Sequence, residues 1–570
     1  PLPPPLIDMD AIVAIAVVVI ALGWVLPLAM LLAWIRGRRI TWGQQVVADM
    51  DAFVAEERRP QAVPKWSMDA AMAAKAKFGE LKYNNANRMI VDGYVRKWLK
   101  EEEPDMRTID IVRFTPIAVE LALTPTTVAV AAHEYSQDRA VVARRGAISY
   151  AKLGCLVVKQ AVTTSINHGV VRGLTCRADH SWVPGKERVV RILAGLGAGV
   201  NYGVHANNLQ NLTRGITERV LYVVRDGRLS KVPQPLKNVF VDRLGKLRGR
   251  LLRRMPPTPV VDVQAFPELY NGRKRVVYQR AADSLLTRGV SKADSFVSTF
   301  LKAEKINFSA KVDPAPRVIQ PRAPRYNVMV GRYLKLYEKQ VFAGFQREFR
   351  YPVVLKGLNA QQVGGWMADH WSQFTRPCAV GLDASRFDQH VSRQALEFEH
   401  SFYNAAFRSD ELRRLLSWQL RNKGIARLPG WRLDYETDGC RMSGDMNTGL
   451  GNCILMSCMV IAYCEHVGIK FRLANNGDDC VVFMEEQDLP QLEGIDRWML
   501  DFGFTLTRED PVFELERVVF CQAQPVYTGS GWRMVRDPFT AMSKDCVSLV
   551  SWSNEVDFRY WATAISKCGL

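Results

Sequence analysis

The 570-residue sequence lacks the cysteine pattern of a disulfide-bonded secreted protein. Its 11 cysteines are an odd number and form no CxxC pair, and several lie inside apolar runs, where cysteine behaves as a small hydrophobic residue. The sequence also lacks internal repeats and long low-complexity segments. Because 48% of its residues are hydrophobic, disorder of the whole chain is excluded. These absences favour a globular protein of several domains in a reducing compartment.

One long stretch, from Ala11 to Ile35, has no charged or strongly polar residue. A helix of this length crosses the hydrocarbon core of a membrane. Acidic residues precede the run, and Arg36, Arg38 and Arg39 follow it, so the positive-inside rule puts the rest of the chain in the cytoplasm. A buried helix is one alternative; a signal peptide would have a basic leader and a shorter apolar core. We expect residues 1–40 to form a membrane anchor.

No convincing catalytic motif occurs before about residue 190. Residues 41–190 mix charged, alanine-rich helical stretches with a β-branched segment, and we assign this N-terminal region no role. From residue 191 onwards, helix-like and strand-like segments mix as they do in α+β enzymes. The chain opens at Pro1, which suits a processed product, a cloned fragment or the part of a longer protein that follows a recoding event.

The formal charge of +18 suits a polyanionic or anionic lipid partner. One basic stretch runs from Asp242 to Met255, where a solvated helix face and an RNA contact are equal alternatives. A second spans Lys302 to Lys339, and its prolines prevent a single long helix. Such a stretch suits a loop that holds triphosphate and template phosphates, with a solvated basic loop as the alternative.

Two adjacent carboxylates occur in the segment Asn475-Asn476-Gly477-Asp478-Asp479, between two apolar runs. Apolar segments on both sides of Asn-Gly predict a β-hairpin, because this dipeptide accepts the positive φ angles of a tight turn. Two aspartates at a hairpin tip repel each other unless a cation neutralises them. A bare Gly-Asp-Asp tripeptide is common in surface turns, but the flanking strands make this one a candidate metal site.

In a second acidic segment, Asp383 lies at the end of a short apolar run, and Asp388 follows five positions later. Two-metal nucleotidyl transfer needs carboxylates from separate strands, because the two ions lie only about 4 Å apart. We therefore predict Asp383 and Asp478 as metal ligands, with Asp479 as a nearby support or partial ligand.

A glycine-rich loop, residues 439–451, leads into the apolar run Cys453–Tyr463 and predicts a flexible loop followed by a buried helix. Thr448 and Asn452 are four residues apart and share one helix face. Small polar groups there suit contact with a ribose. An ordinary helix N-cap loop is an equal alternative.

In chain order these segments resemble the motifs of viral RNA-dependent RNA polymerases. The residues in and around the motifs resemble those of the tombusvirus family, Tombusviridae. Lys302–Arg325 resembles motif F, Asp383–Asp388 motif A, Ser443–Asn452 motif B, Gly477–Asp479 motif C and Phe520–Gln522 the primer grip, motif E. The resemblance covers about residues 195–525 and is specific, because ordered motifs with correct spacing rarely coincide. The resemblance also implies synthesis by readthrough or frameshifting, which suits an opening at Pro1, and we expect an umbravirus-like frameshift product.

This resemblance implies an α+β right-hand fold of fingers, palm and thumb, with fingers and palm in residues 191–525 and a short thumb in 526–570. It implies that Asp383, Asp478 and Asp479 bind two Mg²⁺ or Mn²⁺ ions. The residues implied in ribose selection are Asp388, Ser443, Thr448 and Asn452. Those implied in triphosphate and template binding are Lys302, Lys305, Lys311, Arg317 and Arg322. The primer-grip turn contains Cys521 and Gln522.

The implied partners are the RNA template and product, ribonucleoside triphosphates, an intracellular membrane and other viral replication proteins, in the host cytoplasm with the catalytic region on the cytosolic side. One feature departs from the family: residues 502–516 contain no lysine to serve as the motif D acid, only Arg508, whose pKa is too high for easy proton donation.

Two rival functions remain at this point. A reverse transcriptase would place a bulky residue against the 2′ position of the sugar, and Asp388 and Asn452 argue against it. A non-catalytic, membrane-anchored RNA-binding scaffold explains the anchor and the charge, but it gives the paired carboxylates no purpose.

Overall fold

The structure is a computed structural model that describes residues 65–78, 88–102, 156–169, 171–181, 188–193, 200–550, 552 and 555–569. The predicted anchor, Ala11–Ile35, lies outside the described residues. Helices α4 (Lys65–Phe78) and α5 (Arg88–Glu102) pack against each other through the buried side chains of Ala70, Ala74 and Val95. The rest of the described chain mixes helices and sheets, which confirms the predicted α+β class.

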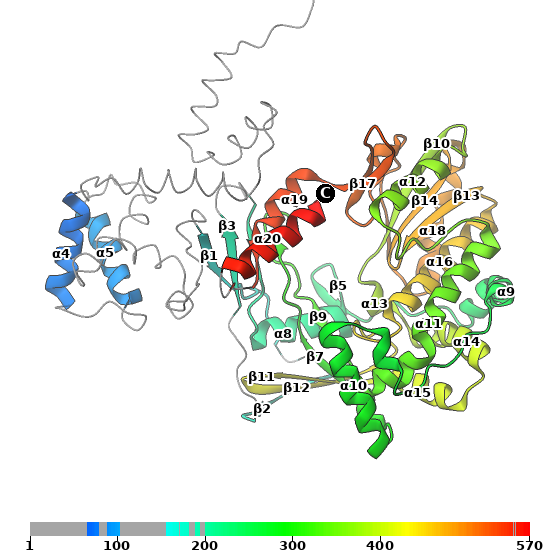
Figure 1. Cartoon of the computed structure of the whole chain (residues 1–570), viewed down its shortest axis with the longest axis horizontal. Helices are drawn as coiled ribbons and strands as arrows, with labels where there is room; N and C mark the ends of the chain where they lie inside the picture. The colour runs from blue at the N-terminus through cyan, green and yellow to red at the C-terminus, as the bar shows by residue number, and fades with distance from the viewer. Residues whose placement is uncertain are drawn as a thin grey trace, which may run out of the picture.

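A four-stranded antiparallel sheet forms the centre of the largest core. Its strand order is β13 (Phe471–Asn476), β14 (Asp479–Glu485), β10 (Pro377–Ala384) and β15 (Leu506–Arg508). Its central strands are buried on both faces over much of their length, since all residues from Cys480 to Met484 of β14 and from Cys378 to Val380 of β10 are buried. Helices that share its core include α9 (Val239–Arg254), α11 (Pro324–Phe349), α12 (Ala360–Trp371), α14 (Arg393–Phe407) and α18 (Ile495–Asp501), which Figure 1 shows in the same part of the molecule as the sheet.

Helix α16 (Thr448–Val467) follows the glycine-rich loop, as predicted, and every residue from Leu450 to Cys464 is buried. It is long and apolar enough to cross a membrane, the one such helix in the part of the chain that is described. However, 83% of its most apolar window is buried inside the protein, packed against β13, α9, α14 and α18. The apolar side chains of α16 are therefore part of the protein core.

A second, five-stranded sheet has the order β2 (Leu174–Asp179), β12 (Gly430–Asp438), β11 (Arg421–Leu428), β7 (Val297–Leu301) and β9 (Val318–Ile319). It contributes Val297, Ala426 and Leu433 to a core of its own, with α8 (Leu209–Ile216). The bridge between Pro321 and Gly444 connects this sheet to the loop before α16.

The C-terminal segment returns to the N-terminal part of the described chain. It contains β16 (Ala523–Tyr527), β17 (Trp532–Arg536), α19 (Pro538–Asp545), β18 (Val547–Ser548) and α20 (Glu555–Gly569). Strand β18 contacts α19 and pairs with β3 (Val189–Leu193), which pairs with β1 (Leu156–Gln160). Strands on both sides of the predicted boundary at residue 191 thus pair with later segments, and the boundary itself stays a prediction.

The basic stretch at 242–255 forms α9, whose apolar side buries Leu244 and Leu247 in the core. Arg243 forms an ion pair with Asp501 at 2.9 Å, and Arg250 forms one with Glu348 at 2.8 Å. These arginines fasten α9 to the neighbouring helices α18 and α11.

Candidate active site

The two adjacent aspartates lie at the tip of the β13–β14 hairpin. Asn476 pairs with Asp479, so the turn is Gly477-Asp478, and Gly477 has a φ of 96°, which glycine adopts without steric cost. Asn475 braces the turn from within: its Nδ2 donates to the Gly477 carbonyl at 2.8 Å and its Oδ1 accepts from the Gly477 N–H at 3.1 Å. The predicted hairpin is confirmed, but its turn residues are Gly-Asp and not Asn-Gly.

Strand pairing brings Asp383 next to this tip. Asp383 lies near the end of β10, and its partner across the β10–β14 ladder is Asp479. Burial and the charges of Asp478 and Asp383 raise the pKa of Asp479. Carboxylates that raise each other's pKa attract a cation, because a cation relieves their repulsion. The three predicted acidic residues therefore lie together, although they come from two distant segments.

A fourth carboxylate lies beside them. Glu509 follows β15, and its backbone N–H donates to the Gly381 carbonyl at 2.9 Å. Its carboxylate covers Gly381 so closely that a Cβ at position 381 would overlap Oε2 of Glu509. Burial and the charges of Asp383 and Asp479 raise the pKa of Glu509. Sequence reasoning missed this residue, because a single glutamate after a three-residue strand carries no pattern.

A buried chain of polar side chains holds Asp388. Asn452 Nδ2 donates to Asp388 Oδ1 at 2.8 Å, and Asn452 Oδ1 accepts from Arg441 Nε at 3.2 Å. Arg441 in turn forms a fully buried ion pair with Glu399. Because a guanidinium only donates, Arg441 fixes the orientation of the Asn452 amide, so that its NH₂ group faces Asp388.

Burial raises the pKa of Asp388 to about 6, although the hydrogen bond from Asn452 acts in the opposite direction. The nearby charge of Asp478 also raises it, so Asp388 belongs to the same electrostatic cluster as the hairpin tip. Asp388 and Asn452, predicted from separate segments, are thus in direct contact. The two hydroxyl residues of the same loop make other bonds: Thr448 Oγ1 donates to the Met442 carbonyl at 2.9 Å, and Ser443 Oγ accepts from the Gln320 N–H at 3.2 Å.

The predicted phosphate-binding residues fall into two groups. Lys302 and Arg317 share one carboxylate, Glu304, at 2.9 and 3.2 Å, and Lys311 is exposed. Lys305 points elsewhere: its Nζ donates to the Lys544 carbonyl at 2.9 Å. The assignment of Lys305 to phosphate is therefore corrected, because this hydrogen bond ties it to the C-terminal segment.

Arg322 is also corrected. Its side chain is completely buried and forms an ion pair with Asp445. The remaining donors reach the Ser295 carbonyl and Asn422 Oδ1, both at 2.6 Å. With its donors occupied and no exposed surface, Arg322 cannot contact a phosphate. It fastens the loop before α16 to the five-stranded sheet.

The predicted primer-grip turn lies against the hairpin tip. Cys521 and Gln522 have φ angles of 52° and 62°, which are uncommon for residues other than glycine. Cys521 Sγ accepts a hydrogen bond from Asn476 Nδ2 at 3.1 Å, and its thiol also bonds with Asp479. The turn and the acidic cluster therefore support each other.

Among the described residues, no three His, Cys, Asp or Glu side chains converge into a complete metal cage. Mg²⁺ seldom uses such a cage, because it is usually held by one or two carboxylates together with substrate phosphates and water. Oxygen donors at Asp383, Asp478 and Asp479 match this preference, and a cation would relieve both the burial and the repulsion by Asp478 and Asp383 that raise the pKa of Asp479. The residues therefore fit a divalent ion.

Comparisons with known proteins agree with this geometry. A family model described as viral RNA dependent RNA polymerase matches residues 176–570, and one described as Tombusvirus p33 matches residues 25–128. The chain is 40% identical to the RNA-directed RNA polymerase of Turnip crinkle virus over 556 residues, which covers 90% of this chain and 71% of that protein. It is 43% identical to that of Carnation mottle virus, over 74% of this chain and 55% of that protein. The chain is 40% identical to the RNA-directed RNA polymerase of Cucumber necrosis virus, over 89% of this chain and 62% of that protein.

The chain thus spans less than two thirds of the Carnation mottle virus and Cucumber necrosis virus proteins, and somewhat more of the Turnip crinkle virus protein. The polymerase family model covers well over half of the chain and includes every motif that the sequence predicted. The tombusvirus resemblance is confirmed: the chain belongs to the viral RNA-dependent RNA polymerases, and it is most similar in these comparisons to RNA-directed RNA polymerases of tombusvirus relatives.

Proposed function

We propose that this chain copies a positive-strand viral RNA genome by two-metal nucleotidyl transfer at the cluster of Asp383, Asp478 and Asp479. The pairing of Asp383 with Asp479 across β10 and β14 is the observation that carries the proposal. It puts carboxylates from separate strands on both sides of one point, which this chemistry requires. In this proposal the β10–β14 sheet is the palm of a right hand, the five-stranded sheet belongs to the fingers, and the segment after residue 525 is a short thumb.

These three carboxylates would hold two Mg²⁺ or Mn²⁺ ions. When bound, the ions would lower the pKa of the primer 3′-hydroxyl and neutralise the departing pyrophosphate. The chain itself supplies position and charge: the hairpin fixes two of the acids, and the turn at Cys521 supports the hairpin from the side on which the primer would lie.

The Asp388–Asn452 pair would select the ribose. A 2′-hydroxyl both donates and accepts, so it can bond with the free acceptor of Asp388 and with the Asn452 amide. Ser443 and Thr448 would support the pair through the loop that they close. A sugar without the hydroxyl would leave polar groups of the buried Asn452 and the partly buried Asp388 without this partner, and this is costly.

Lys302, Lys311 and Arg317 would hold the triphosphate and the template phosphates. Lys302 and Arg317 now neutralise Glu304, and a triphosphate would compete for them with a larger negative charge. No lysine is available in residues 502–516 to protonate pyrophosphate, and Arg508 holds its proton too firmly for that task. That proton donor stays unassigned.

Incorporation of labelled ribonucleotides on a primed RNA template tests the proposal. The purified chain with Mg²⁺ is expected to extend the primer, and Asp478→Asn is expected to abolish extension while RNA binding persists. Asp496→Asn, which changes an exposed aspartate on α18, is the matched control and should retain activity. Extension by Asp478→Asn at the wild-type rate would refute the site. Use of deoxyribonucleotides in preference to ribonucleotides would indicate a reverse transcriptase, and RNA binding without extension would indicate a scaffold.

We also propose that residues 11–35 anchor the chain in an intracellular membrane of the host, with the polymerase on the cytosolic side, and that other viral replication proteins are partners there. The apolar run and the arginines after it support the anchor, and the match of residues 25–128 to Tombusvirus p33 supports the partners. Co-flotation of the full chain with lipid vesicles, lost on deletion of residues 1–40, is the expected result. Flotation of the deleted chain would contradict it.

A further inference from the structure

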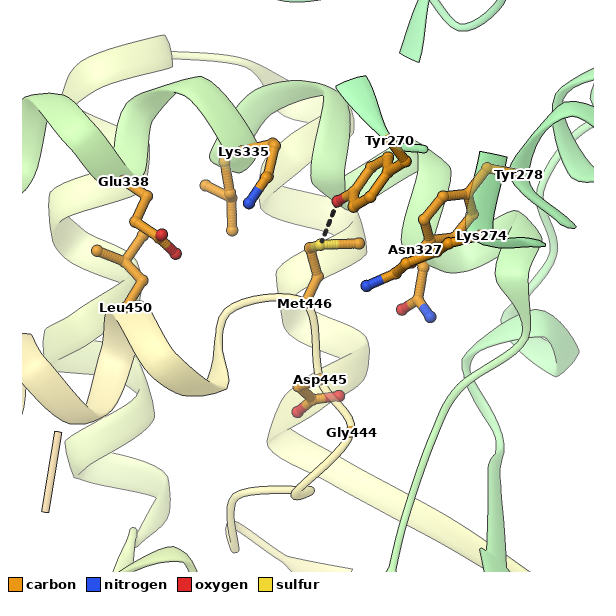
Figure 2. Close-up of a pocket in the computed structure, with 11 residues that line it drawn as sticks. Tyr270, Lys274, Tyr278, Asn327, Lys335, Glu338, Gly444, Asp445, Met446 and Leu450 are labelled. Atoms are coloured by element: carbon orange, nitrogen blue, oxygen red, sulfur yellow. Dashed lines mark hydrogen bonds between the residues drawn. The ribbon is translucent and has the colours of Figure 1, made fainter. Parts of the chain in front are cut away.

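A cavity of about 190 Å³ lies between α10 (Gly272–Thr287), α11 and the loop that precedes α16. Figure 2 shows the rings of Tyr270 and Tyr278 on one side, with Met446 of the loop facing them and the Tyr270 hydroxyl bonded to its sulfur. A cavity of 150 Å³ accepts a benzene molecule, so this one has room for a single aromatic ring system.

The mouth of this cavity is positively charged. Lys274 Nζ lies 4.8 Å from the centre of the Tyr270 ring, and Lys335 Nζ lies 5.8 Å from it. Arg273, Lys274 and Arg275 occupy the first turn of α10 and are exposed, and no acidic residue shares that turn. No ion pair of these three is present in the described part of the chain. Positive side chains at a helix N-terminus are unfavourable unless an anion neutralises them.

The wall of the cavity also holds one polar atom that lacks a partner among the described residues. Asn327 Oδ1 is buried, and no hydrogen bond to it occurs among the described residues. Glu338 adds a carboxylate on the far side of the cavity, as Figure 2 shows. An acceptor buried without a partner is costly, and a ligand that brings an N–H group to Asn327 would remove this cost.

We propose that this cavity binds one unpaired base of the single-stranded RNA template, close to the catalytic cluster. The base would stack on Tyr270, its amino groups would bond with Asn327 or Glu338, and Lys274 and Lys335 would hold the flanking phosphates. Stacking on aromatic side chains, with basic residues along the backbone path, is the usual way in which proteins hold single strands.

Two observations favour a strand over a free nucleotide. The basic residues are not confined to the cavity: Arg273 and Arg280 are exposed on α10 and, being seven residues apart, share one helix face, which suits contact with more than one phosphate and exceeds the need of one mononucleotide. The cavity also borders the loop that precedes α16: Gly444, Asp445 and Met446 line it, and the charge of Asp445 acts on Asp388. This proposal rests on the proposed polymerase function, because it assigns the strand to the template.

The test combines an abasic template with a tyrosine variant. Binding of primed RNA templates is measured without nucleoside triphosphates, each template carrying one abasic nucleotide at a different place ahead of the primer end. In the wild-type chain, one abasic position is expected to weaken binding about fivefold or more. In Tyr270→Leu the intact template should bind as weakly, and the same abasic position should have no further effect. Tyr270→Phe should behave as the wild type.

If Tyr270 had a purely structural role, the loss of binding caused by Tyr270→Leu and the loss caused by an abasic nucleotide would multiply at every position of the template. That result would overturn the proposal. Lys274→Ala, which changes an exposed side chain, should reduce the salt dependence of binding by about one phosphate contact, while Lys246→Ala on α9 should not. Displacement of the RNA by a mononucleotide in a Tyr270-dependent manner would assign the cavity to a free nucleotide instead. Because no catalysis is measured, failure here would leave nucleotide incorporation, and thus the proposed function, standing.

Discussion

Asn452 donates a hydrogen bond of 2.8 Å to the carboxylate of Asp388, and Arg441 holds the other end of the same amide. The orientation of Asn452 is therefore set from outside the sugar site. Gly451 makes this arrangement possible, because a Cβ at position 451 would overlap both Arg441 and Glu399. Ribose selection, on this view, depends on a buried ion pair that never contacts the substrate.

The first prediction concerns this pair. Asn452→Ala removes the amide that holds Asp388 and that we propose to contact the sugar, so the preference for ribonucleotides over deoxyribonucleotides should fall roughly tenfold. Single-nucleotide incorporation with each substrate measures the ratio. Ser457→Ala, on the same helix but within the core, is the control and should leave the ratio unchanged. An unaltered ratio in Asn452→Ala would remove Asn452 from sugar selection.

The second prediction concerns stability and pH. The pKa of Asp388 is raised to about 6, so the folded state binds a proton more readily than the unfolded chain does. Its burial as an anion therefore costs stability above pH 6, and this cost fades as the pH falls through 6. Asp388→Asn should increase the free energy of unfolding by on the order of 1–2 kcal/mol at pH 7.5, and the gain should shrink at pH 5. Denaturant unfolding at both pH values measures it. A gain that grows at pH 5 would contradict the assignment.

The third prediction separates two arginines that looked equivalent in the sequence. Arg317 is exposed and should contact phosphate, so Arg317→Ala should raise the KM for nucleotides about tenfold and leave stability nearly unchanged. Arg322 is buried with Asp445, so Arg322→Ala leaves an unpaired buried charge and should lower the free energy of unfolding by about 3–5 kcal/mol. Unfolding curves and steady-state kinetics of both variants test this. Equal loss of stability in the two would refute it.

This contrast shows what the sequence could and could not predict. The hairpin and the buried helix followed from local patterns, because apolar runs beside Asn-Gly and after a glycine-rich loop determine their own structure. The burial of Arg322 did not, because its partner Asp445 is far away in the chain and charge patterning does not distinguish a phosphate ligand from a buried ion pair. Asp383 and Asp479 were recognised through their motifs, but only strand pairing places them opposite each other.

The last prediction concerns Glu509, the acidic residue near the site that the sequence analysis did not identify. Its carboxylate adds negative charge beside Asp383 and Asp479, so Glu509→Gln should weaken divalent-ion binding and raise the Mg²⁺ concentration for half-maximal incorporation about three- to tenfold. The raised pKa of Glu509 means that this difference from the wild type should diminish as the pH falls, since the carboxylate then becomes protonated in the wild type. Gly381→Ala keeps the charge but displaces the carboxylate, because the added Cβ would overlap Oε2, and it should produce a smaller shift in the same direction. Titration of Mg²⁺ at two pH values compares the three chains. Identical Mg²⁺ curves for the wild type and Glu509→Gln would show that the carboxylate takes no part in the site, and its place over Gly381 would then be a matter of packing alone.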